Sequence, residues 1–280
     1  MGSRGLGGGC EAPRPGRAST PLAEALTWAM ERPPLSRYAG MHAAELGMGR
    51  RFTYVVSEEG CLGLAYAWGD EPLPSWLLDR EYTLAELASM AWSHPALTSL
   101  ALAAANAAMC SLIEADPGVV SFGADVLELL GSLEGRRVAL VGYVPGVARG
   151  LRERGASVTV YEDNPMHRRE AEGAGYHARP GPQLLLEAGG YDYVVATGSS
   201  LVTPTLYKAL AGANVRAALV GPTSSFHPAS VARLGFSVIG GSYVPRENRG
   251  RVVALVKLGM GFRKLRGLVR KWAAEAGEQP

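Results

Sequence analysis

Residues 138–162 read VALVGYVPGVARGLRERGASVTVYE, which is an apolar run, a stretch of helical length and a second apolar run. The same alternation continues, with further apolar runs at 193–198, 217–222 and 237–241. Each run is continuous rather than alternating between apolar and polar residues. That pattern is typical of a parallel sheet covered by helices on both faces. Right-handed crossovers between such strands predict an α/β fold, a doubly wound, Rossmann-like domain over residues 131–280.

Residues 21–130 follow a different pattern, which predicts a smaller α+β domain. Two apolar runs, at 52–57 and 61–68, are separated by Glu58-Glu59-Gly60. A three-residue separator that ends in Gly is typical of a β-hairpin. Helical patterns flank this hairpin, and a pair of strands together with helices is typical of the α+β class.

Helix start signals mark two helices in this first half. Thr20 precedes Pro21, and Pro is favoured at the first position of a helix that follows a Thr cap. Thr83 is followed three residues later by Glu86, which is the spacing of a capping box. We therefore expect helices over residues 21–31 and 84–92.

A long Ala-rich segment, residues 96–113, contains no charged residue. It follows His94-Pro95, and its helical pattern continues to about residue 115. The length suits a membrane span, but the many Ala residues, together with Thr, Ser and Asn, make transfer into lipid poor beside a Leu-rich span. We expect a buried helix rather than a membrane helix.

The composition is that of a globular protein. Of the 280 residues 47% are hydrophobic, which excludes wholesale disorder. Residues 1–20 are mostly Gly, Pro and Arg and lack the apolar run of a secretory signal, so they predict a flexible arm. The three cysteines, Cys10, Cys61 and Cys110, form no CxxC pair and are too few for a disulfide framework. We therefore expect a cytoplasmic protein in a reducing compartment.

The segment from Arg246 to Lys271 is strongly basic, with nine Lys and Arg residues against one acid, Glu247. Apolar residues recur through Trp272 at three- and four-residue steps, which predicts an amphipathic basic helix or a pair of helices. Its basic face is either simply solvated or docks an anionic ligand, a partner chain or nucleic acid. The net charge of +2 is too small to predict a polyanion partner for the whole molecule, and a homodimer remains open.

Loops at the carboxyl ends of the predicted parallel strands are the expected ligand site. Four of the five carry either Gly together with small hydroxyls or an acid, which suits a close approach of the backbone to an anion. The alternative is that these glycines only form tight turns between strands and helices. The loops are Gly142-Tyr143-Val144-Pro145-Gly146, Glu162-Asp163-Asn164-Pro165, Thr197-Gly198-Ser199-Ser200, Gly221-Pro222-Thr223-Ser224-Ser225 and Gly240-Gly241-Ser242.

Known short motifs do not identify the ligand. The first loop reads Gly142-x-x-x-Gly146 rather than GxGxxG, although Glu162 lies at the distance from Gly142 at which an acid binds a ribose hydroxyl. A dinucleotide therefore remains an alternative. No HExxH or paired CxxC occurs, so spacing assigns no metal site. His167 and His227 follow strand-end loops, and Glu162 and His227 are the candidate metal ligands.

Three longer stretches resemble the putative heavy-metal chelation family, a group of uncharacterised prokaryotic proteins. The resemblance covers about residues 130–260 through the Gly-Tyr turn at 142–143, TGSSLV-x-x-T at 197–205 and GPTS at 221–224. GLAYAW at 63–68 and Ala-Asn-Ala at 105–107 look like the first domain of the family. The resemblance implies an enolase-N-terminal-like α+β domain, then a Rossmann-like domain, with a cleft between them.

That resemblance also implies the binding of a metal ion or a metal-bearing small molecule at the domain interface. Among the matching positions only Glu162 is a natural metal ligand, whereas hydroxyls and backbone groups suit phosphate or carboxylate. An anion or metabolite cleft is therefore favoured over a chelation site. The positions carried over by the resemblance are Asn106, Gly142, Tyr143, Glu162, Thr197, Gly198, Ser199, Thr205, Gly221, Pro222 and Thr223.

Three functions remain open at this point. In the first, a small anionic or metal-bearing ligand binds between the domains, oriented by Asn106 and Glu162 and held by Ser199 and Thr223. Asn106 has the alternative role of bonding its helix to a neighbouring loop. In the second, a lyase or transferase acts on a metabolite there, with Glu162, Tyr143 or His227 as acid or base. In the third, the basic C-terminal segment binds nucleic acid.

Overall fold

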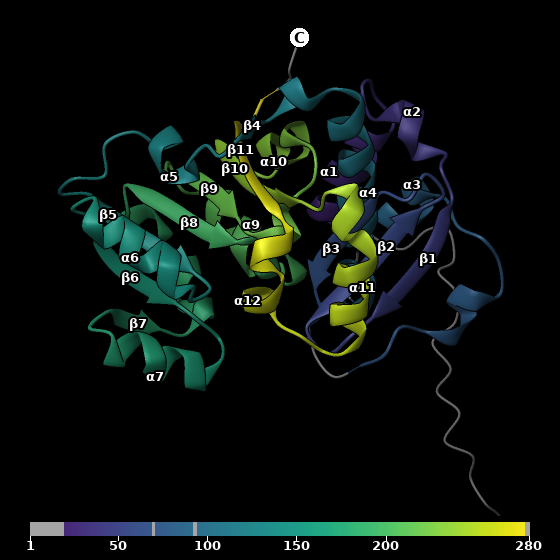
Figure 1. The fold of residues 1–280 in the computed structure, drawn as a ribbon. Coiled ribbons are helices and arrows are strands. Elements are labelled where there is room, and N and C mark those ends of the chain that lie inside the picture. Colours follow the sequence, from purple (N-terminus) through teal and green to yellow (C-terminus); the bar gives the residue numbers. More distant parts are fainter. Residues whose placement is uncertain (1–19, 69–70, 92–93, 278–280) are drawn as a thin grey trace, which may run out of the picture.

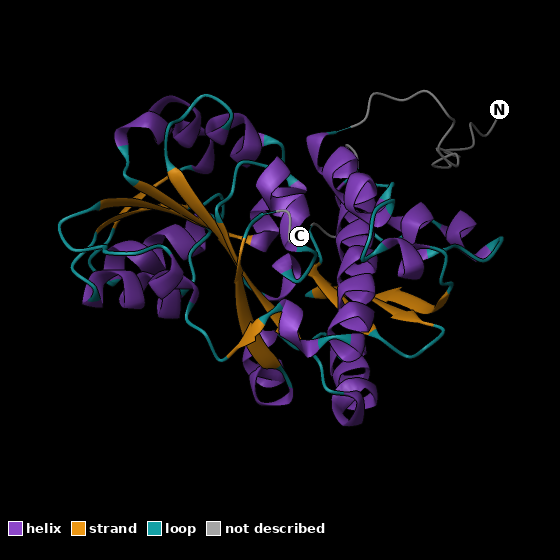
Figure 2. Cartoon of the chain, turned by 90° about the horizontal axis from the view of Figure 1, so that it is seen from above, coloured by secondary structure: helices purple, strands orange, loops and turns teal. Residues whose placement is uncertain are grey.

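The computed structural model describes residues 20–68, 71–91 and 94–277. Within these ranges the chain forms a three-stranded sheet and an eight-stranded sheet, and a long helix, α4 (Pro95–Ala115), stands between them (Figures 1 and 2). The flexible arm expected at residues 1–20 lies, except for Thr20, outside the described residues.

The three-stranded sheet is antiparallel and contains the predicted hairpin. Its strands follow in the order β1 (Ala43–Met48), β2 (Phe52–Ser57) and β3 (Leu62–Tyr66). Gly60 lies in the turn between β2 and β3 with a φ of 81°, a left-handed conformation that favours glycine. Strand β1 is not predicted from the sequence, because AAELGM lacks the β-branched residues of a typical strand.

Both predicted helix caps of the first half are present. The Thr20 side chain accepts a hydrogen bond from Ala23 N, and Thr83 and Glu86 form the complete capping box. The helix after Thr83 ends earlier than predicted, at Ala88. The other helices of this half are α1 (Pro21–Met30), α2 (Ser36–Ala39), η1 (Ser75–Leu78), α3 (Leu84–Ala88) and η2 (Pro117–Val119).

Helix α4 is the buried helix predicted from residues 96–113. Its apolar window is long enough to cross a membrane, but 100% of that window is buried inside the protein. The small sheet packs closely on α4 at Gly63, where a Cβ atom would lie 1.9 Å from the carbonyl oxygen of Ala103. The opposite face of the small sheet packs against α11 (Arg249–Lys257). Helices from both halves of the chain therefore cover this sheet.

The eight-stranded sheet confirms the predicted Rossmann-like fold. Its order is β4-β11-β10-β9-β8-β5-β6-β7, and the strands from β10 to β7 are parallel. β6 and β8 flank β5, so the direction of winding reverses between β5 and β8, where doubly wound folds place their ligands. The parallel strands are β5 (Arg137–Val141), β6 (Ser157–Tyr161), β7 (His177–Arg179), β8 (Tyr193–Thr197), β9 (Arg216–Val220) and β10 (Val238–Tyr243).

Helices lie on both faces of this sheet (Figure 2). Apolar residues of the strands alternate between two core clusters, one of which continues onto α4 and the first half of the chain. The α-helices are α5 (Val126–Leu129), α6 (Pro145–Glu153), α7 (Pro165–Gly173), α8 (Leu184–Glu187), α9 (Thr205–Leu210) and α10 (Pro228–Arg233). The 3-10 turns are η3 (Gly181–Gln183), η4 (Ala188–Gly190), η5 (Gly198–Val202) and η6 (Pro222–Ser224).

The basic C-terminal segment is only partly helical. Three short elements, η7 (Arg246–Asn248), α12 (Phe262–Leu265) and η8 (Arg266–Leu268), accompany α11, as a helix pair would require. The prediction that the helical pattern includes Trp272 is wrong, because Arg270–Glu275 forms β11, antiparallel to β10 and paired also with β4 (Ser121–Phe122). Trp272 is 1% exposed and lies opposite Gly241, whose missing side chain leaves room for the indole.

Candidate metal centre

Two of the predicted site residues join the two halves of the molecule. The Nδ2 atom of Asn106, on α4, donates to Leu64 O at 2.6 Å and to Thr223 O at 3.1 Å. Tyr66 N, at the end of β3, donates to Thr223 Oγ1 at 2.9 Å. Asn106 and Thr223 are both buried, at 3% and 2% exposure. These contacts match the helix-to-loop role that the sequence left open for Asn106.

The loops that follow β8 and β9 pack against each other. A Cβ atom at Gly198 would lie 2.6 Å from Ser224 N, and Gly221 has a φ of 114°. Pro222 O accepts hydrogen bonds from Asn106 Nδ2 and from Ser225 Oγ. In these two loops Gly198 therefore permits close packing, and Gly221 permits a turn.

A second group of predicted residues lies at the end of β5 and β8, where the winding reverses. Gly142 has a φ of 83°, and a Cβ atom there would lie 2.3 Å from Thr197 Oγ1. Thr197 Oγ1 lies 2.8 Å from Ser199 Oγ and 3.1 Å from Ser200 Oγ. The missing side chain of Gly142, directly after β5, leaves room for the Thr197 hydroxyl. We call Thr197, Ser199 and Ser200 the hydroxyl cluster. Thr205 is farther along the chain, as the first residue of α9.

Glu162 binds backbone amides of this region. Its Oε2 accepts from Tyr143 N and its Oε1 from Asn164 N, both at 2.9 Å. His167 Nδ1 lies 4.0 Å from the same carboxylate. Burial raises the pKa of the Tyr143 phenol. The carboxylate of Glu162 thus already occupies amide groups that an anionic ligand would otherwise use.

His227 caps a helix. It precedes α10, and its Nδ1 accepts a hydrogen bond from Ala229 N at 3.2 Å. Burial lowers the pKa of His227 to about 4, so the ring is neutral at neutral pH. Among the described residues, neither His227 nor Glu162 belongs to a group of three potential metal ligands.

Such a group does occur where the hairpin meets α4. The sulfur atoms of Cys61 and Cys110 and a carboxylate oxygen of Glu114 all lie within 4.8 Å of one another. Cys61 follows Gly60 in the hairpin turn, and Cys110 and Glu114 are one helical turn apart on α4. Cys61 is 0% and Cys110 4% exposed, and both thiols are free. We call these three residues the Cys–Cys–Glu cluster.

Arg249 of α11 closes the Cys–Cys–Glu cluster on one side. Its Nη2 donates to Cys110 Sγ at 3.3 Å and to Glu114 Oε1. Its Nη1 donates to Gly60 O at 2.8 Å and its Nε to Val244 O at 3.3 Å. Arg249 is 6% exposed, so a fixed positive charge lies buried beside the sulfur atoms.

Glu114 is held by further donors. Arg246 Nη2 reaches Oε2 and the Tyr243 hydroxyl reaches Oε1, each at 3.0 Å. Burial alone would raise the pKa of Glu114, but the hydrogen bonds from Arg246 and Tyr243 and the charge of Arg249 outweigh it and lower the pKa. Glu114 is therefore a carboxylate at neutral pH.

The two thiols differ in acidity. The hydrogen bond between them lowers the pKa of Cys61 and raises that of Cys110, and burial raises the pKa of Cys110 further. A thiolate is the form that binds metal ions.

This cluster is not predictable from the sequence, because its residues come from separate elements. Spacing motifs such as CxxC detect ligands on one loop or one helix. The only local signal was the pair Cys110 and Glu114, which share one face of a helix. Cys61 joins them only because the hairpin packs on α4.

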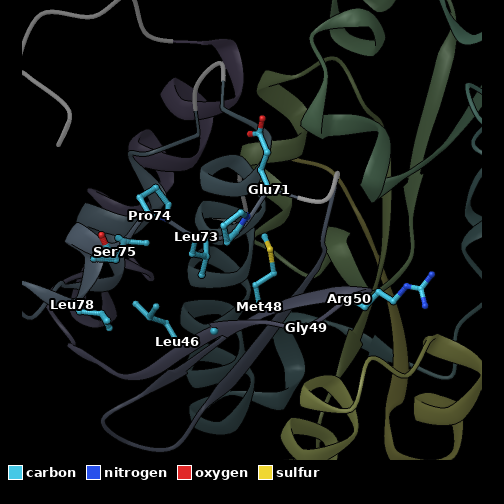
Figure 3. Close-up of a pocket in the computed structure, with 12 residues that line it drawn as sticks. Leu46, Met48, Gly49, Arg50, Glu71, Leu73, Pro74, Ser75 and Leu78 are labelled. Carbon is cyan, nitrogen blue, oxygen red and sulfur yellow. The ribbon is translucent and has the colours of Figure 1, made fainter. Parts of the chain in front are cut away.

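Two pockets lie elsewhere on the surface. One, of about 400 Å³, is lined by residues 46–50 of β1 and the following turn and by residues 71–75, 77 and 78 (Figure 3). The other, of about 420 Å³, includes Arg137, Thr159 and Arg179 in its lining. Neither is lined by a residue of the Cys–Cys–Glu cluster or by a predicted site residue.

Comparisons with known proteins agree on one family. Two family profiles, DUF364 over residues 125–275 and DUF4213 over residues 35–109, match the chain, and both are described as putative heavy-metal chelation. No curated protein matches it.

Two solved structures share the fold of nearly the whole chain. A DUF364-family protein with unknown function from Pyrococcus horikoshii has 23% identity and a TM-score of 0.73, covering 91% of this chain and 99% of its own. A protein with unknown function from the same family in Desulfitobacterium hafniense DCB-2 has 21% identity and a TM-score of 0.69, covering 91% and 97%.

Proposed function

This chain belongs to the putative heavy-metal chelation family, and on that premise we propose that it binds a thiophilic metal ion at the Cys–Cys–Glu cluster. The observation that carries the proposal is the approach of two free thiols and a carboxylate to within 4.8 Å of one another. Thiolates are soft ligands that select soft metal ions such as Cu(I), Zn(II) and their heavier relatives. Burial of both sulfur atoms favours a bound ion over exchange with solvent.

The proposed metal position lies between the two halves of the chain. Cys61 and α4 come from the first half, whereas Arg249 and Tyr243 come from the second. The general location agrees with the interface expected from the sequence, but the ligands are different residues. Two free thiols persist in a reducing compartment, so we place this function in the cytoplasm.

A second candidate function is the binding of a small anionic metabolite at the hydroxyl cluster of Thr197, Ser199 and Ser200. The observation in its favour is the position of these hydroxyls beside Gly142, at the point where the winding of the parallel sheet reverses. Hydroxyls and backbone N–H groups are suitable partners for phosphate or carboxylate oxygens. Glu162, committed to Tyr143 N and Asn164 N, would fix the shape of this site.

One experiment tests both functions. Protein purified anaerobically and without chelator is measured by native mass spectrometry, under non-denaturing and then denaturing conditions. We expect an excess mass equal to a metal ion, released on denaturation, absent in Cys61→Ser and in Cys110→Ser. Cys10→Ser is the matched control and should retain the ion.

The opposite pattern would overturn the metal proposal. If Cys61→Ser and Cys110→Ser, once loaded with Hg(II) or Cd(II), bind as many equivalents as the parent protein, the cluster is not the site. An organic mass that survives Cys61→Ser but is lost in Thr197→Val would instead support the second candidate.

A further inference from the structure

We infer that the Cys–Cys–Glu cluster selects a monovalent thiophilic ion, Cu(I) or Ag(I), held by Cys61 and Cys110 alone. This inference rests on the proposed function and specifies the ligand of the same site. Two observations carry it: the hydrogen bonds that Glu114 already accepts and the buried charge of Arg249.

Glu114 already accepts hydrogen bonds from three other side chains. Its two oxygens accept hydrogen bonds from Arg249, Arg246 and the Tyr243 hydroxyl. A carboxylate has about four lone-pair positions, so three are in use. Coordination by Oε1 would have to displace hydrogen bonds from Arg249 and Tyr243, and at the remaining position on Oε2 a cation would lie beside the guanidinium charge of Arg246. The two sulfur atoms are therefore the ligands left to an incoming ion.

Two ligands suit few metal ions. Zn(II) in structural sites is almost always bound by four ligands in a tetrahedron. Water could complete such a shell, but Cys61 and Cys110 are 0% and 4% exposed. Cu(I) is selected by soft sulfur ligands, and like Ag(I) it accepts two-coordinate, linear geometry.

The buried guanidinium of Arg249 favours one charge state of the complex. When a monovalent ion replaces the two thiol protons, the product is an anion, [S–M–S]⁻, and two protons are released without any change of oxidation state. Arg249 Nη2, which lies 3.3 Å from Cys110 Sγ, pairs with that negative charge. A divalent ion gives a neutral dithiolate, which gains no such pairing. Bonds to Gly60 O and Val244 O hold Arg249 in place.

The two sulfur atoms are close enough for one ion to bind both. Metal–sulfur bonds of about 2.3 Å place two sulfur atoms on opposite sides of one ion about 4.6 Å apart. The two sulfur atoms lie within 4.8 Å of each other. They also approach from different elements, the hairpin turn and α4, so an ion between them would connect these elements.

The test is a competition titration of the full chain, reduced and anaerobic, with Cu(I) supplied from a chromophoric Cu(I) chelator. We expect one Cu(I) per chain and the release of about two protons per ion in weakly buffered solution. X-ray absorption at the copper edge should give two sulfur neighbours and no oxygen neighbour.

Variants separate the contribution of each group. Arg249→Met should weaken Cu(I) binding at least about tenfold, as expected for the loss of a hydrogen bond to a charged group, but leave Hg(II) binding within about threefold. Arg251→Met, an exposed position on the same helix, is the matched control. Glu114→Gln, which keeps hydrogen-bonding capacity, should still bind one Cu(I) per chain with two sulfur neighbours and no oxygen neighbour.

The outcomes distinguish this inference from the proposed function. Tighter binding of Cd(II) or Zn(II) than of Cu(I), together with weaker binding in Glu114→Gln, overturns the inference and leaves the metal function intact. An oxygen neighbour in the copper spectrum also overturns it, even if Arg249→Met fails to fold. If neither Cu(I), Cd(II) nor Hg(II) depends on Cys61 and Cys110, both the inference and the proposed function are wrong.

Discussion

His227 shows what burial does to one titratable residue. Its Nδ1 caps α10 through Ala229 N, whereas its Nε2 is buried and has no hydrogen-bond partner among the described residues. Because there is no acceptor to stabilise a proton, desolvation dominates and lowers the pKa of His227 to about 4, from 6.5 for the ordinary side chain. Between about pH 6.5 and pH 4, His227 is therefore protonated in the unfolded chain but not in the folded protein.

This difference predicts a pH dependence of stability. Between about pH 6.5 and pH 4 the unfolded chain binds the proton and the folded chain does not, so the free energy of unfolding falls as the pH falls. The contribution of His227 is fully present above about pH 6.5, and about 3 kcal/mol is lost by pH 4. Urea unfolding at pH 7, 5.5 and 4.5 measures it. His227→Asn, which retains a side-chain cap, should show a shallower decline; equal slopes for the two proteins would contradict the prediction.

For single residues of the candidate sites, the sequence predicts burial and polarity better than it predicts their partners. The sequence predicts Asn106 and Thr223 as ligand-binding residues, with a bond to a neighbouring loop as the alternative for Asn106, because a buried Asn in an Ala-rich helix must find hydrogen-bond partners. Asn106 donates to Thr223 O, and Thr223 Oγ1 accepts from Tyr66 N. The sequence alone does not distinguish such bonds from ligand binding. Cys61 and Cys110 carried no spacing signal, because packing rather than chain proximity brings them together.

At the scale of elements, the parallel strands were the most predictable feature. Their continuous apolar runs can be satisfied only where both faces of a sheet are covered, so the pattern identifies them without tertiary information. Strand β11 was not predictable in the same way, since RKWAAE has only one large apolar residue and follows a segment with helical spacing. Its conformation is decided by pairing with β10 and by the space that Gly241 leaves for Trp272.

That space predicts the effect of a small substitution. In Gly241→Ala the new Cβ atom would lie 2.3 Å from Trp272 Cζ2, so the indole must move out of its position in the core. We expect the free energy of unfolding to fall by about 1 to 3 kcal/mol, as in other overpacked cores. Gly250→Ala on α11, where a Cβ atom meets nothing within 4 Å, is the control. Denaturant unfolding compares the two, and a Gly241→Ala protein as stable as Gly250→Ala would disprove this account of the packing.

At the scale of the whole molecule, the two halves hold each other in place. The small sheet lies between α4 from its own half and α11 from the other half. Asn106 and Tyr66 bind the loop after β9, and Arg249 binds the hairpin turn at Gly60. The division into residues 21–130 and 131–280 that the sequence predicts remains a proposal, and the exchange of contacts across it favours cooperative unfolding.

We expect the protein to unfold in one transition, with tryptophan fluorescence and far-ultraviolet circular dichroism coinciding along a urea titration. Asn106→Leu should lower the free energy of unfolding by about 3 kcal/mol, because Leu64 O, Pro222 O and Thr223 O lose a buried donor. Ser111→Ala, five residues farther along α4, removes long bonds, of 3.4 Å to Ala107 O and 3.8 Å to Met41 Sδ, and should change stability by less than about 1 kcal/mol. Two separated transitions in the parent protein would show that the halves unfold independently.

The position of β11 also bears on how the protein is made. Both neighbours of β11 in the sheet, β4 and β10, are synthesised before it. A nascent chain that has already produced β10 therefore carries an open strand edge, with the backbone N–H and C=O groups unpaired and the site of Trp272 empty. Open edges of this kind are templates for aggregation. Between synthesis of β10 and of β11 the growing polypeptide thus carries an edge that is open to aggregation.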